Sequence, residues 1–182
     1  MASEISLLIP DFRKQLIRSL DAAKSKGLQI EVITTVITPV QQASLWKQGR
    51  TRTDAELKTL ALEHAGAPFL AECFRKAVAQ DTNIVTDDLP GCSWHQWGEA
   101  ASVVWVDGAN KINWSTTMMY GVGVGNGYKN FAKILNDFSI HCAGEFDDSP
   151  VAWRTAILRP LKDATGAYTI QQIDAEMQRR YK

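Results

Sequence analysis

The sequence predicts an α+β fold in which a small, mostly antiparallel sheet is flanked by helices. Apolar residues recur every three to four positions near both ends of the chain, which is the spacing of amphipathic helices. Residues 101–106 form a short β-branched run that ends in Asp107-Gly108, a dipeptide typical of a hairpin turn. No repeat or linker divides the 182 residues, so we expect one domain over residues 1–182.

In the first half of the chain, helical spacing surrounds one alternating run. Leu8, Phe12 and Leu16 share one face of the first helix, and a glycine after Lys26 ends it. A second helix opens at Pro39, since proline is well suited to the first helical turn. The expected elements are a helix at residues 3–26, a strand at 28–37, and helices at 39–48, 55–64 and 69–79.

In the second half, strands come first and a helix comes last. Residues 111–114 follow the Asp107-Gly108 turn and provide the return strand of a hairpin. A glycine-rich segment, residues 121–127, lacks both the dinucleotide-binding and the Walker patterns and is interpreted as a loop. The remaining expected elements are a helix at residues 128–138, a strand at 151–158 and a polar helix at 170–181. We expect the two terminal helices to pack on the domain.

Charge and hydropathy restrict the classes of function. Lys plus Arg and Asp plus Glu each number 20, and no basic stripe occurs, so we expect no nucleic-acid partner. Polar residues interrupt the first apolar segment too early for a signal peptide or membrane span. We therefore expect a monomer that is cytoplasmic as synthesised, with no membrane insertion. Any action on the cell wall would require release by lysis or by a phage-tail or secretion machine.

The densest group of functional residue types lies in residues 90–108. This run holds His95 and three of the six tryptophans, and it begins as a loop and ends as a strand. A side chain at such a junction is held by the sheet and can still face a cleft. The alternative is that His95 is a core histidine packed between tryptophans.

Ser93-x-His95-x-x-Gly98-x-Ala100 resembles the signature of the zinc D-Ala-D-Ala carboxypeptidase and L-alanyl-D-glutamate peptidase family. This family includes many phage endolysins, and its fold is shared with the Hedgehog signalling domain. The resemblance covers about residues 28–158, with further similarity at residues 44–51 and 84–91. It implies a Hedgehog/DD-peptidase-like fold. It also implies that Arg50 and Ser93 lie near a bound peptide. The flat apolar ring of Trp94 or Trp97 would form a wall of the same cleft.

The chain departs from this family at the metal site. The resemblance places zinc ligands at His95, at the position seven residues later and at a late histidine. Ser102 and Val151 occupy the latter two positions, and neither provides a good ligand for zinc. Asp148 fits the position of the family's catalytic acid/base, although without a metal that role would be vestigial.

Two functions follow. The first is a catalytically inactive relative of a peptidoglycan peptidase, without a cofactor, whose cleft binds a stem peptide or a protein partner. The second is an active zinc murein peptidase whose ligands include His141 with Asp147 or Asp148. A relocated metal site is a further alternative, and it would use a set of four soft ligands: Cys92, His95, His141 and Cys142. With three cysteines, neither a disulfide framework nor a paired Cys-x-x-Cys site is indicated.

Overall fold

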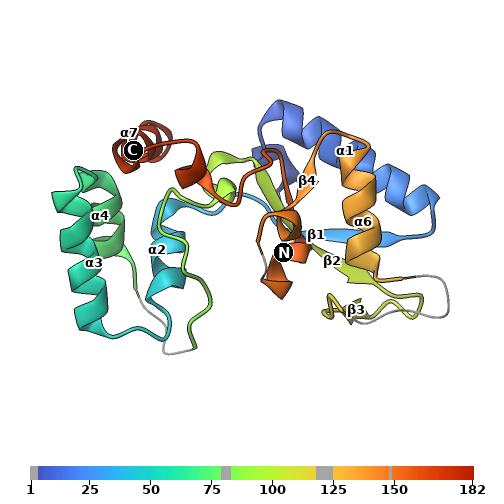
Figure 1. Ribbon diagram of the computed structural model, residues 1–182, viewed down its shortest axis with the longest axis horizontal. Coiled ribbons are helices and arrows are strands. Elements are labelled where there is room, and N and C mark those ends of the chain that lie inside the picture. Colours follow the sequence, from blue (N-terminus) through green and yellow to red (C-terminus); the bar gives the residue numbers. More distant parts are fainter. Residues whose placement is uncertain (1–3, 79–82, 118–124, 148) are drawn as a thin grey trace. The chain divides into compact units, whose positions relative to one another are not determined.

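A computed structural model describes residues 4–78, 83–117, 125–147 and 149–182 (Figure 1). Contacts divide the chain into two compact units. The sheet unit comprises Met1–Val36 and Gly98–Lys162, and the helical unit comprises Ile37–Trp97 and Asp163–Lys182. Each unit is therefore formed by two separate stretches of sequence. The expected single domain stays a prediction.

The described residues of the sheet unit form five strands, and the pairings between these strands are antiparallel. β2 (Ala100–Val106) lies at the centre, where it pairs with β1 (Gln29–Thr34) along one edge. Along its other edge, the end of β2 pairs with β3 (Ile112–Asn113) and its start pairs with β5 (Thr155–Ile157). β4 (His141–Cys142) extends the sheet beyond β5. The α+β class and the predicted hairpin are confirmed.

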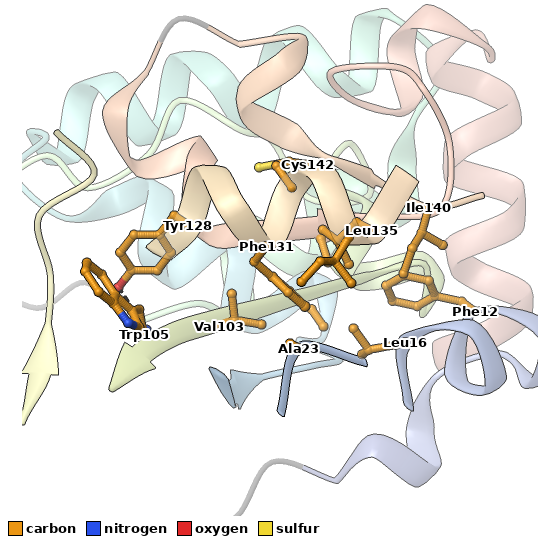
Figure 2. Close-up of a cluster of buried hydrophobic side chains, with 14 of the residues drawn as sticks. Phe12, Leu16, Ala23, Val103, Trp105, Tyr128, Phe131, Leu135, Ile140 and Cys142 are labelled. Carbon is orange, nitrogen blue, oxygen red and sulfur yellow. Dashed lines mark hydrogen bonds between the residues drawn. The ribbon is translucent and has the colours of Figure 1, made fainter. Parts of the chain in front are cut away.

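One face of this sheet is covered by α1 (Pro10–Ser25) and α6 (Gly127–Asn136). Their apolar stripes and alternate residues of β2 form a continuous core, which Figure 2 shows in close-up: Phe12, Leu16, Val103, Trp105, Tyr128, Phe131 and Leu135. Because side chains alternate along a strand, Ser102 and Val104 lie on the opposite face of β2. The position that the family resemblance assigns to a metal ligand is thus on the face away from this core.

The helical unit is formed by α2 (Pro39–Lys47), α3 (Arg52–His64), α4 (Pro68–Lys76) and α7 (Ile170–Tyr181). Capping boxes begin three of them, at Thr38, Thr51 and Thr169. α4 lacks such a cap, because Ala67 precedes it. Asp174 of α7 accepts a hydrogen bond from the Leu70 amide at 2.8 Å and so satisfies one of the free donors of α4.

The predicted boundaries differ from the structure at several points. The predicted helix 3–26 is a 3-10 turn, Ile5–Leu7, followed by α1, because the residue before Pro10 is held in an extended conformation. The predicted strand 151–158 begins only at Thr155, since Pro150–Arg154 forms a 3-10 turn. α4 ends at Lys76, three residues before the predicted end, and β4 was not predicted. Within the described residues, no helix has both the length and the hydropathy to cross a bilayer.

Candidate functional site: the His95 turn

His95 lies in a 3-10 turn, Trp94–Trp97, that directly precedes the sheet unit. We call residues 90–97 the His95 turn. Backbone hydrogen bonds from Cys92 to Leu89 and from Gln96 to Ser93, both 3.0 Å, tighten it. Ser93 and His95 are half-buried, whereas the residues beside them are buried. The turn therefore holds both side chains at the boundary between core and solvent.

The C-terminal segment of the helical unit donates hydrogen bonds to backbone carbonyls of the His95 turn. The Ala164 amide donates to the Cys92 carbonyl at 2.8 Å. Arg180 Nη1 donates to the Trp97 carbonyl at 2.7 Å, and the Tyr181 hydroxyl donates to the Gln96 carbonyl at 2.6 Å. One backbone amide and two side chains from a segment far along the chain thus satisfy carbonyl acceptors that the turn leaves free. The family resemblance, which ends near residue 158, did not indicate these residues.

Trp97 is enclosed by side chains of the same unit. Tyr168 stacks on its ring with centroids 4.8 Å apart, and the Arg180 guanidinium lies 5.3 Å from its centroid on a cation–π contact. Its indole nitrogen donates to the Gly91 carbonyl at 2.7 Å. Trp94 meets Trp97 edge to face at 5.8 Å and is only 2% exposed. This burial favours the alternative in which the tryptophans pack as core.

Arg50 is connected to the segment that leads into the turn. Its guanidinium donates to the carbonyls of Trp46 and Thr86 and to the carboxylate of Asp87, and it lies 4.2 Å from the Trp46 ring centroid. The Arg50 side chain is 11% exposed, whereas that of Asp87 is 94% exposed. A guanidinium that already binds a carboxylate has the geometry for another one. Asp87 was not identified from the sequence.

Two buried glutamines tie the turn to α2. Gln96 Nε2 donates to Gln42 Oε1 at 3.2 Å, and Gln42 Nε2 donates to the Asp88 carbonyl at 2.9 Å. Both side chains are buried, so these bonds are shielded from water. The sequence contained no pattern that would have paired residues so far apart.

The predicted ligand positions are divided between the two units. Arg50, Ser93, Trp94 and His95 belong to the helical unit, whereas Ser102 and Val151 belong to the sheet unit. Ser102 is the register partner of Thr155, and the two hydroxyl oxygens are 3.5 Å apart. Asp148 lies outside the described residues. At the position where the family resemblance places a ligating aspartate, the chain therefore has a pair of neutral hydroxyls.

These residues do not fit a zinc centre. Neutral hydroxyls lack the charge of an aspartate, and cysteine ligates zinc as the thiolate. Burial raises the pKa of both Cys92 and Cys142 to about 12. His141 Nδ1 lies 3.7 Å from Glu145 Oε2, and these two side chains are fewer than the three protein ligands that a catalytic zinc needs. Across residues 4–78, 83–117, 125–147 and 149–182, no three His, Cys, Asp or Glu side chains are grouped to hold a metal ion.

Comparison with known protein families and with curated proteins finds no match. Among solved structures, the chain is similar to a zinc-bound variant of VanY, the vancomycin-resistance D,D-pentapeptidase of the VanB-type cassette. The TM-score is 0.46 with 16% sequence identity, over 91% of this chain and 83% of that one. Similarity at this level says nothing about which residues act.

Proposed function

We propose that this chain is a non-hydrolysing relative of peptidoglycan peptidases that binds a cell-wall stem peptide or a protein partner. The observation that carries the proposal is the hydroxyl pair of Ser102 and Thr155 at a position where the family resemblance requires a carboxylate. A zinc peptidase needs three protein ligands and a metal-bound water of lowered pKa. Loss of a charged ligand removes the basis for that chemistry.

Binding does not need the metal, and Arg50 has the features of a carboxylate receptor. Its guanidinium lies over the Trp46 ring, and hydrogen bonds to two backbone carbonyls fix its orientation. Its carboxylate partner, Asp87, is almost fully exposed and can be displaced. The terminal carboxylate of a peptide would then take the place of Asp87. Without a metal, we expect an affinity between micromolar and millimolar, or about 4 to 8 kcal/mol.

Metal content tests the first half of the proposal. Native protein dialysed against zinc should contain no stoichiometric metal by mass spectrometry. The double variant Ser102→Asp with Val151→His restores the ligand types of the family and should bind zinc. Thr155→Asp with Val151→His is the matched control, because it adds the same carboxylate on the neighbouring strand. Stoichiometric zinc in the native chain would contradict the proposal.

If neither double variant binds zinc while both remain folded, the correspondence of positions 102 and 151 with the family's ligands is wrong. Stem-peptide titration tests the second half of the proposal, with the intrinsic tryptophan fluorescence as the readout. Asp87→Ala frees the Arg50 guanidinium without touching the core. Because Asp87 is exposed, water screens this ion pair and it contributes about 0.2–1 kcal/mol, so this variant should bind a peptide carboxylate about 1.5- to 5-fold more tightly. Arg50→Ala should abolish binding. If the Asp87 variant binds no more tightly, Arg50 is not the receptor.

A further inference from the structure

The helical unit contains a pocket of about 520 Å³ in which no residue of the His95 turn takes part. It is formed by the end of α2 and by the facing sides of α3 and α4. Its volume falls in the range of pockets that bind small molecules. Ala55, Leu60 and Phe74 provide its apolar lining. Leu60 is 51% exposed, so the pocket presents apolar surface to solvent.

The charged lining of this pocket is mainly cationic. Lys47, Arg52 and Arg75 stand against one acid, Glu56. Arg52 pairs with Glu56 at 2.7 Å, and Arg75 pairs with Glu63. A guanidinium has five N–H donors, so each of these pairs leaves donors for a further acceptor. The excess of positive charge favours an anion over a neutral or cationic ligand.

Of the three cationic side chains that line the pocket, Lys47 is the least exposed to solvent. Its ammonium donates to the carbonyls of Phe74 at 2.6 Å and Ala77 at 2.8 Å, at the C-terminal end of α4. A lysine has three N–H donors, and no described residue accepts the third. Burial lowers the pKa of Lys47. An anion in the pocket would accept the third hydrogen bond and favour the charged form.

We propose that this pocket binds a carboxylate joined to an apolar group, with Lys47 and Arg75 on the carboxylate and Leu60 on the apolar group. The carboxylate could belong to a free fatty acid or to the C-terminal residue of a peptide. These sources share the same chemistry at the pocket. The proposal goes beyond the peptide-carboxylate role of Arg50 and does not depend on it.

Amide chemical shifts of α3 and α4 during titration test this site. The probes are octanoate, octanol and acetate, which separate the charge from the apolar group. Octanoate should saturate the shifts at about tenfold lower concentration than octanol, and acetate should fail to saturate. If octanol binds as tightly as octanoate, or if the shifts occur elsewhere, the proposal is overturned. A stronger response to acetyl-Leu-Leu than to octanoate would identify a peptide terminus as the source. The reverse order would identify a free acid, and both orders support the site.

Variants of the cationic side chains test which of them bind the carboxylate. Lys47→Met keeps the aliphatic stem and should weaken octanoate binding at least fivefold, but it also removes two hydrogen bonds to the end of α4. Arg75→Gln is therefore the second variant, since Arg75 is half exposed and makes no such bond. The matched control is Arg179→Gln, an exposed arginine of α7 that also pairs with a glutamate. Unchanged octanoate binding in the Arg75→Gln variant would contradict the proposal. Loss of octanoate binding in Arg50→Ala would also contradict it, because octanoate would then bind at Arg50 and not in this pocket.

Discussion

Replacement of Gly91 by alanine tests whether α7 packs on the His95 turn as described. Gly91 has a φ of +80°, and a Cβ there would lie 2.5 Å from Ile173 Cγ2 and 2.9 Å from Met177 Cγ. Both side chains belong to α7 and are fully buried, so they have no free space into which to move. The left-handed backbone costs an L-residue about 1–2 kcal/mol, and overpacking costs about 1–3 kcal/mol. We therefore expect Gly91→Ala to lower the free energy of unfolding by about 2–5 kcal/mol.

Gly66→Ala is the matched control in the same unit. Its φ is +75°, but the nearest atom to an added Cβ is Gln171 Cγ at 3.4 Å, in an exposed side chain. Only the backbone cost of about 1–2 kcal/mol should remain. Urea unfolding followed by tryptophan fluorescence measures both variants. Equal losses of stability would refute the packing of α7 against the turn.

Three further predictions concern the same segment and the buried thiols. Arg180→Gln should change tryptophan fluorescence, because Arg180 contacts the ring and donates to the carbonyl of Trp97. Arg179→Gln, which removes the neighbouring exposed arginine, should leave the fluorescence unchanged. Hydrogen bonds from Arg179 and then Arg180 lower the pKa of Glu176 from 4.5 to about 2. Stability from Glu176 is thus complete above about pH 4.5 and falls towards pH 2. Glu176→Gln should flatten this part of the stability curve, and an unchanged curve would contradict the pairing. The three cysteines are buried, and their pKa values are raised to about 11 or 12. A thiol reagent at pH 8 should therefore modify them only after denaturation. Rapid modification of the folded protein would contradict their burial.

Local patterns in the sequence predicted most of the elements but not their ends. Periodicity located α1, α6 and α7, because each has an apolar stripe to bury, and Pro39 located the start of α2. The two-residue strand β4 is too short to show any alternation, and it exists only because β5 provides its partner. Capping shifted the boundaries: Thr51 and Asp54 form a box that begins α3 three residues before the predicted start.

The candidate site was predictable to a smaller extent. Ser102 and Val151 could be identified as departures from a ligand set, because a motif defines positions by spacing. The contacts of Arg50 with Asp87 and of Arg180 with Trp97 join residues 37 and 83 positions apart, and no local pattern encodes such pairs. The burial of Trp94 is likewise a property of the tertiary structure. The α4 cap from Asp174 is a third example, over 104 positions.

Hydrolysis of a defined stem peptide is the most direct measurement of the central claim. Purified protein is incubated with zinc and a muramyl peptide that ends in D-Ala-D-Ala, and the products are followed by mass spectrometry. A chain with hydroxyls at Ser102 and Thr155 in place of a ligating carboxylate should leave both the L-Ala-D-Glu and the D-Ala-D-Ala bonds intact. Zinc-dependent cleavage of either bond, abolished by His95→Ala, would contradict the account.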